Sequence, residues 1–141
     1  MGSLYDDDIL EWSEHQARLL RQLASGQPAN EAPDWDNIID EVESVGRSQL
    51  ASVRSYLTRA LEHDLKARGW PDTIYVPQWQ AEARRFRGEA ADSYSRSMRQ
   101  HLNVDELYRR ALRILPTTID GLPPLALPET CPYTLDDLLA G

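Results

Sequence analysis

The sequence predicts an all-α protein, an up-and-down bundle of four main helices in which the long second helix is central. Two observations support this prediction. Apolar residues recur at steps of three and four along one stretch of the chain, which is the period of a helix with one buried face. The only short run with β character, residues 73–76, is closed by Pro77. Because 141 residues suffice for one core, we expect a single helical domain over residues 1–141.

The first helix is expected from about Asp6 to Ala24. Its apolar residues fall on one side, and three aspartates stand near its N-terminal end, where the helix dipole favours negative charge. Gly26 and Pro28 end this helix. The polar loop that follows closes with Asp34, a residue type that caps helix N-termini, so we expect the second helix to begin directly after it.

The second helix is expected from Trp35 to about Arg68, because Gly69 takes the usual C-cap position and Pro71 prevents continuation. At about 1.5 Å per residue this helix is roughly 50 Å long. We expect its apolar stripe to be buried, and the indole rings of Trp12 and Trp35 to be mostly buried as well. The stripe consists of Trp35, Ile38, Ile39, Val42, Val45, Leu50, Val53, Leu57, Leu61 and Leu65.

A glycine inside this helix needs a reason, because glycine in a helix interior costs about 1 kcal/mol relative to alanine. Gly46 falls within the apolar sector set by Val42 and Val45. We therefore expect a crossing helix to approach closely at Gly46, and a kink or break there is the alternative.

The third helix is expected to begin at Pro77, a residue favoured in the first helical turn. A short break is expected at residues 92–95, followed by a fourth helix that continues to about Leu115. A proline-rich segment follows, which includes Pro123, Pro124, Pro128 and Pro132 and which we call the strap. We expect it to wrap over the bundle. Thr134 with Asp137 three residues later resembles a capping box, which predicts a short last helix.

The net charge of −8 is distributed unevenly along the chain. Residues 1–46 hold 11 acidic and 2 basic side chains, and residues 47–115 hold 8 acidic and 13 basic ones. The last 26 residues add 4 acids and no base. Because phosphate contacts supply much of the affinity for nucleic acids, an acidic chain is a poor candidate for binding them. We expect the acidic first quarter to pack beside the basic middle.

The location predicted for the chain is cytoplasmic. Its single cysteine, Cys131, cannot form an internal disulfide, and no charged segment followed by an apolar one precedes the first helix. No apolar run approaches the roughly 18 residues that a membrane span needs. We therefore expect no membrane association. Cys131 also has no histidine nearby in the sequence, so packing is a better explanation for it than nucleophilic chemistry.

Two neighbouring residues near the end of the second helix are candidates for a functional site. His63 carries the side chain whose charge changes near neutral pH, and it lies at the edge of the apolar stripe, where packing is the commoner role. Asp64 falls near the middle of the same apolar sector. An unpaired carboxylate there would be costly to bury, so either an arginine pairs with it or that end of the helix is solvated.

The acidic residues Asp40, Glu41 and Glu43 raise the question of a metal, because carboxylates are hard ligands. Di-iron bundles, however, need Glu-x-x-His spacings on facing helices, and no such spacing occurs in this chain. A solvated acidic face is the simpler interpretation, and we expect no metal and no cofactor. Glu41, Glu43, Gly46, His63 and Asp64 remain the candidate functional residues.

A second pattern concerns RNA chemistry. Arg96 and His101 form an Arg-x4-His pattern that resembles the short motif of the HEPN family of all-α ribonucleases. In that family an arginine and a histidine beside a dimer interface act on RNA. A local basic patch would have to attract the substrate, and one is available from Arg84, Arg85, Arg87, Arg96 and Arg99.

Four segments of the chain form a pattern that is similar to that of a known family. They are Tyr5–Asp6 before Trp12, Asp40–Arg47, His63 with Leu65 and Lys66, and Pro128–Thr134. Together they resemble the bacterial family known as domain of unknown function 29. The resemblance covers essentially the whole chain and implies a helical single domain of bacterial origin, without implying a chemistry.

The chain departs from the pattern of this family in three places. Asp64 stands where the family usually has an apolar residue, and Ala67 stands where it often has an aromatic one. The loop before Pro77 also lacks a basic, serine-rich character.

The sequence does not define a function, and it favours a non-enzymatic interaction or regulatory protein. No combination of nucleophile, base and orienting group can be assembled from three histidines and one cysteine. A protein partner or a second copy of the chain is the expected partner. The alternative is an RNA-cleaving or metal-dependent enzyme that uses Arg96 and His101, or His63 with Glu41 or Glu43.

Overall fold

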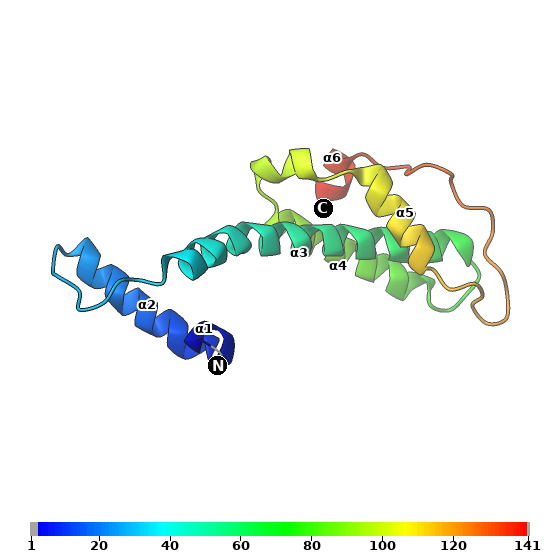
Figure 1. Ribbon diagram of the computed structural model, residues 1–141. Helices are drawn as coiled ribbons and strands as arrows, with labels where there is room; N and C mark the ends of the chain where they lie inside the picture. The colour runs from blue at the N-terminus through cyan, green and yellow to red at the C-terminus, as the bar shows by residue number, and fades with distance from the viewer. Residues whose placement is uncertain (1–2, 141) are drawn as a thin grey trace. The chain divides into compact units, whose positions relative to one another are not determined.

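The longest element of the computed structural model, which describes residues 3–140, is the helix α3, Trp35–Gly69, with 35 residues. Figure 1 shows it as one uninterrupted ribbon that changes from cyan to green. The other elements of the described chain are also helices, and the only β pairing there is an isolated bridge between Ile119 and Leu122. The all-α class and the long second helix are therefore confirmed. None of the helices within residues 3–140 has the length and apolar character that crossing a membrane requires.

The contacts within the chain divide it into two compact units, residues 1–47 and residues 48–141. The boundary lies within α3, so each unit contains a part of that helix. A single domain over residues 1–141 stays a prediction.

The first unit contains α1, Leu4–Asp7, α2, Ile9–Ala24, and the first turns of α3. The predicted helix from about Asp6 to Ala24 is present as α2 and ends at Ala24 as predicted. Its predicted start is wrong, because the chain leaves the helical conformation at Asp8, with φ −151° and ψ 88°. The Asp8 carboxylate accepts a hydrogen bond from the Glu11 backbone N–H at 3.1 Å and so caps α2. Aspartate favours caps over helix interiors for this reason.

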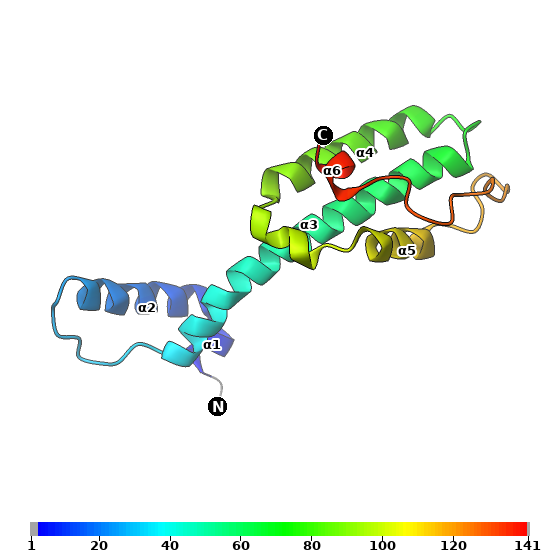
Figure 2. The ribbon, with the colours of Figure 1, turned by 90° about the horizontal axis from the view of Figure 1, so that it is seen from above.

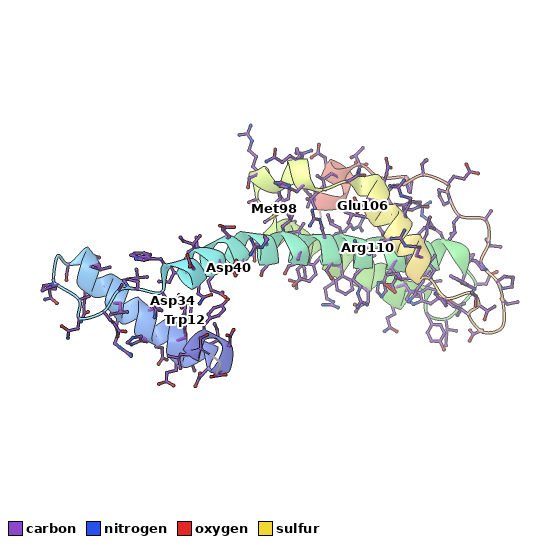
Figure 3. The ribbon with its side chains drawn as sticks, in the orientation of Figure 1. Trp12, Asp34, Asp40, Met98, Glu106 and Arg110 are labelled. Atoms are coloured by element: carbon purple, nitrogen blue, oxygen red, sulfur yellow. The ribbon has the colours of Figure 1, made fainter. Side chains whose placement is uncertain are left out.

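The centre of the first unit joins α2 to the start of α3. Trp12 is only 6% exposed, as predicted, and its indole Nε1 donates to Asp34 Oδ2 at 3.0 Å. The buried Gln16 side chain accepts a hydrogen bond from the Asp34 backbone N–H at 2.7 Å. Figure 3 shows Trp12 and Asp34 facing each other. Asp34 therefore directly precedes α3, as predicted, and fixes its beginning.

The first part of the α3 stripe is not buried, contrary to the prediction. Trp35 is 50% exposed, Ile39 53%, Val42 68% and Val45 71%. Helical periodicity places apolar residues on one side, but they become buried only where another element covers that side. The explanation of Gly46 by a crossing helix is also wrong, since a Cβ there would meet no atom within 4 Å. A break is excluded because α3 continues through this position.

The second part of the stripe is the core of the second unit. Val53, Leu57, Leu61 and Leu65 are at most 1% exposed, as predicted. They pack against the helix α4, Val76–Ser93, the 3-10 helix η1, Arg96–His101, the helix α5, Val104–Ile114, and the helix α6, Leu135–Leu139. Figure 2 shows α3, α4 and α5 in this unit and the strap that returns over α3 towards α6. The partner residues are Ala90, Met98, Leu102, Leu107, Tyr108, Ala111, Leu135 and Leu138.

The predicted break near residues 92–95 is confirmed, because Tyr94 after the end of α4 is extended. The predicted fourth helix is shorter than expected. Residues Arg96–His101 form the 3-10 helix η1, and Leu102 and Asn103 are extended. The Asn103 side chain then caps α5 by accepting from the Glu106 backbone N–H at 3.1 Å. An asparagine cap set the start of this helix, and the apolar pattern did not reveal it.

The strap lies over the second unit, as predicted. The hydroxyl group of the buried Tyr108 on α5 donates to the carbonyl oxygen of Pro128 at 2.6 Å, which holds the strap against that helix. The last helix, α6, begins with the predicted capping box. Thr134 and Asp137 exchange hydrogen bonds between side chain and backbone at 2.8 and 3.1 Å.

Candidate functional site

The structure shows how Asp64 is accommodated. Its Oδ2 accepts a hydrogen bond from Arg68 Nε at 2.8 Å, and its Oδ1 accepts one from the Tyr133 hydroxyl group at 2.9 Å. Arg68 Nη2 also donates to the Tyr133 oxygen at 3.0 Å. These contacts raise the pKa of Arg68 above its usual range, with the hydrogen bond to Tyr133 as the largest cause. Of the two alternatives left open by the sequence, pairing with an arginine is correct.

His63 has local partners of its own. Its Nδ1 lies 2.8 Å from the carbonyl oxygen of Arg59, one turn earlier on α3. Because a carbonyl oxygen only accepts, Nδ1 carries the proton of this hydrogen bond. The imidazole ring is partly buried beside the Phe86 ring, with 5.5 Å between the ring centres. His63 and Asp64 therefore bind different neighbours. The contacts of His63 with Arg59 and Phe86 fit the packing role that the sequence favoured, and this role stays a prediction.

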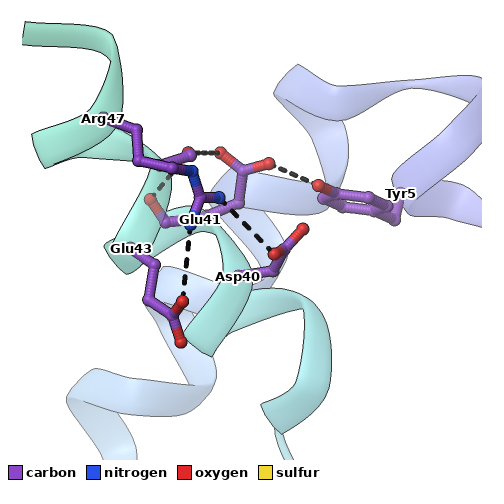
Figure 4. A network of polar contacts seen from close by, with 6 residues as sticks. Tyr5, Asp40, Glu41, Glu43 and Arg47 are labelled. Carbon is purple, nitrogen blue, oxygen red and sulfur yellow. Dashed lines mark hydrogen bonds and ion pairs between the residues drawn. The ribbon is translucent and has the colours of Figure 1, made fainter.

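The acidic residues of the first unit form a chain of pairwise contacts (Figure 4). The Tyr5 hydroxyl group donates to Glu41 Oε1 at 2.5 Å, and this bond to a carboxylate is the main reason that the pKa of Tyr5 is raised to about 12. Arg47 lies 3.4 Å from Glu43 Oε2 and 3.7 Å from Asp40 Oδ1. Asp40 and Glu43 thus share Arg47 as their partner, whereas Glu41 binds Tyr5.

The two forms of the enzyme hypothesis find little support in these positions. Residues 3–140 contain no group of three or more His, Cys, Asp or Glu side chains placed to hold a metal ion. Arg96 and His101 are the first and last residues of η1, and both are exposed. The main chain of His101 is engaged, since its carbonyl oxygen accepts from Arg54 Nη2 at 2.9 Å.

Cys131 lies partly buried against the core of the second unit. Burial raises the pKa of its thiol, so the uncharged form is favoured at neutral pH. A nucleophilic cysteine needs the opposite shift. This environment matches the packing role expected from the sequence.

An open hollow of about 480 Å³ lies between α3 and α5, and the sequence did not predict it. Arginines from both helices border it, whereas the basic patch suggested by the sequence involved α4 and η1. A signal was available on α3, where positions 51, 54, 55 and 58 fall on one face of a helix. The contribution of α5 could not be read from spacing. The lining residues are Ala51, Arg54, Ser55, Thr58, Arg59, Glu106 and Arg110.

The two units also differ in charge. Residues 1–47 hold 11 acidic and 3 basic side chains, so the whole net charge of −8 belongs to this segment. Residues 48–141 hold 12 of each kind. The acidic character and the exposed apolar residues of α3 therefore occur in the same unit.

These features define a small all-α protein with a candidate surface on α3 and a hollow between α3 and α5. The chain belongs to the family described as domain of unknown function DUF29, whose model matches residues 4–141, and the resemblance found in the sequence is confirmed. No curated protein matches the chain.

A solved structure supports the fold. The chain is similar to the crystal structure of an alpha-helical protein of unknown function from Rhodospirillum rubrum, with a TM-score of 0.67 and 22% sequence identity. The match covers 99% of this chain and 90% of that one. At this identity the similarity supports the all-α fold over nearly the whole chain and gives no function.

Proposed function

We propose that the protein is a non-enzymatic interaction or regulatory protein of the bacterial cytosol, and that it docks a partner protein on the first part of α3. The observation that carries this proposal is the exposed apolar surface there, which we call the α3 face. It consists of Trp35, Ile39, Val42 and Val45, each at least half exposed.

Exposed apolar residues are common when they are scattered singly, but a contiguous set marks an interaction surface. The four residues of the α3 face follow one another at steps of three and four, so they share one side of the helix. One of them is a tryptophan, a residue type enriched in protein interfaces. The helix itself is continuous here and presents these side chains on a rigid support.

Charge complementarity selects the kind of partner. The α3 face lies in the unit that carries the whole net charge of −8, so a partner with a basic rim around an apolar centre fits it. A second copy of the same face would bring two acidic surfaces together, which electrostatic repulsion disfavours. We therefore propose a cationic protein as the partner.

The test compares the full-length chain with a variant that carries Val42→Lys and Val45→Lys. Both positions are exposed, so the variant should fold normally while its docking face becomes charged. We expect the wild-type chain to recover one basic protein in stoichiometric amount from its host at low salt. High salt and the double substitution should each abolish this recovery, as measured by quantitative mass spectrometry.

The matched control carries Ser13→Lys and Gln22→Lys, which add the same two charges at exposed positions of α2 in the same unit and should leave the recovery unchanged. Light scattering of the purified chain completes the test. If no stoichiometric partner is recovered and the chain is monomeric, the proposed function is wrong. If the wild-type chain is a dimer and the double substitution dissociates it, the partner is a second copy of the chain and not a cationic protein.

A further inference from the structure

We propose that the hollow between α3 and α5 in the second unit binds the phosphate group of a small molecule. This proposal is independent of the docking face, because its residues all lie within residues 48–141. The hollow has a volume of about 480 Å³. That volume is within the range of roughly 300–1,000 Å³ typical of small-molecule sites.

Three guanidinium groups from two different helices border this hollow. Arg54 and Arg59 come from α3, and Arg110 comes from α5 (Figure 3 labels Arg110 and Glu106 on that helix). Arg54 is partly buried, and its Nη2 donates to the carbonyl oxygen of His101 at 2.9 Å. One of its nitrogens is therefore anchored to the main chain, which orients the guanidinium plane and leaves its other donors available.

The charge of these arginines is poorly compensated. Within residues 3–140, neither Arg54 nor Arg110 forms an ion pair with a carboxylate. Arg59 lies 4.0 Å from Glu62, too far for a hydrogen bond, and the buried Glu62 side chain lies closer to Lys66, at 3.4 Å. Glu62 Oε2 has no hydrogen-bond partner in the described chain.

The net charge of the residues that line the hollow indicates the class of ligand. Three arginines and one glutamate leave an excess of two positive charges around it. Phosphate is close to a dianion at neutral pH, and its oxygens match the fork of donors on a guanidinium group. A phosphate monoester or free phosphate therefore fits the charge better than a single carboxylate would.

The remaining lining residues fit a ligand that only accepts hydrogen bonds. The Thr58 hydroxyl group is already engaged, since it donates to the carbonyl oxygen of Arg54 at 2.8 Å. Ser55 is exposed and lines the hollow, so its hydroxyl group can donate to a bound oxygen. Ala51 is small and keeps the hollow open beside these groups.

The test measures binding of inorganic phosphate, pyrophosphate and AMP to the full-length chain by isothermal titration calorimetry, at constant ionic strength set with sodium chloride. We expect saturable binding at one site per chain. Arg110→Gln should weaken it by about tenfold or more, because one charge-assisted contact is lost. Arg110 is exposed, so this substitution should leave folding intact. Glu106→Gln removes the only lining carboxylate and should strengthen binding.

The matched control is Arg109→Gln, which makes the same charge change at an exposed position of α5 that does not line the hollow. It should change the affinity by less than about twofold. Amide chemical shifts in an NMR titration should move at residues 51–59 and 106–110. Equal affinity for phosphate and AMP would identify free phosphate as the ligand, and tighter binding of AMP would identify an organic phosphate.

Three results would overturn the proposal. The first is the absence of saturable binding of all three probes. The second is an equal loss of affinity in Arg110→Gln and Arg109→Gln, which would indicate a general charge effect. The third is binding of a single-stranded RNA without binding of any of the small phosphates, since that would make the surface a nucleic-acid site.

Discussion

Gly46 and Gly69 belong to the same helix but meet different surroundings. A Cβ at Gly46 would have no atom within 4 Å, whereas one at Gly69 would lie 3.0 Å from Pro124 Cβ in the strap. The Gly69 carbonyl oxygen also accepts a hydrogen bond from the Leu125 backbone N–H at 2.9 Å. At Gly69 the missing side chain lets the strap approach α3, and at Gly46 no contact within residues 3–140 requires glycine.

This contrast predicts opposite effects of the same substitution. Gly46→Ala should raise the free energy of unfolding by about 1 kcal/mol, because alanine favours a helix interior and the new methyl group meets nothing. Gly69→Ala should lower it, because Pro124 and the strap must move. Urea unfolding followed by circular dichroism measures both values. A loss of stability in Gly46→Ala would show that another surface covers this position in solution.

Asp64 illustrates how much of a polar site the sequence can reveal. Its partner Arg68 stands four positions later, the spacing at which helical side chains meet, so this pair was within reach of sequence reasoning. Its second partner, Tyr133, is 69 positions away and comes from the strap. Such a contact depends on how the strap returns over the core, and no local pattern encodes it.

At the scale of the helix, α3 has two parts with one hydrophobic pattern and two environments. The pattern correctly predicts the helix and the side that carries apolar residues. It cannot distinguish the part that other helices of this chain cover from the part that they do not, because both show the same period. Within the described residues the covered part begins near Val53, and Val42 and Val45 lie before it.

We predict that two substitutions on this stripe separate its parts. Leu61→Ala should lower the free energy of unfolding by about 2–5 kcal/mol, because it removes a side chain that is 1% exposed and leaves a cavity. Val42→Ala should change it by less than about 0.5 kcal/mol, since Val42 is 68% exposed. Urea titrations of both purified variants provide the comparison. A loss above about 2 kcal/mol in Val42→Ala would mean that the α3 face is buried in solution, for example in a dimer.

The residues that set where a helix begins are not the apolar residues that predict the helix. The capping box at Thr134 and the proline at the start of α4 could be recognised in the sequence. The helices α4 and α6 accordingly begin within one residue of the predicted position. The beginnings of α2 and α5 depend on side-chain caps from Asp8 and Asn103. Both lie inside segments whose composition also suits a helix, so the apolar pattern alone extended the helices past these caps.

At the scale of the whole chain, the two units differ in how much apolar surface they bury. Trp12, Leu19 and Pro33 are the buried apolar side chains of the described first unit, and the remaining ones all belong to the second. Segments of fewer than about 60 residues bury too little surface to be very stable by themselves. The acidic charge concentrated in residues 1–47 adds electrostatic repulsion within the same unit. We therefore expect the unit that carries the proposed docking face to be the less stable one.

This difference predicts that the two units open with different free energies. In native-state hydrogen exchange of the full-length chain, we expect amides of α2 to open at a free energy roughly 2 kcal/mol or more below that of amides at 53–65 in α3. The α2 amides should also show a weaker dependence on urea, because opening the first unit exposes less surface. Mass spectrometry of peptides from the two regions measures both quantities in one sample, so each region serves as the control for the other. Adding a docked partner should raise the protection of the first unit towards that of the second. Equal opening free energies with equal urea dependence in the free chain would instead show that residues 1–141 unfold as one cooperative domain.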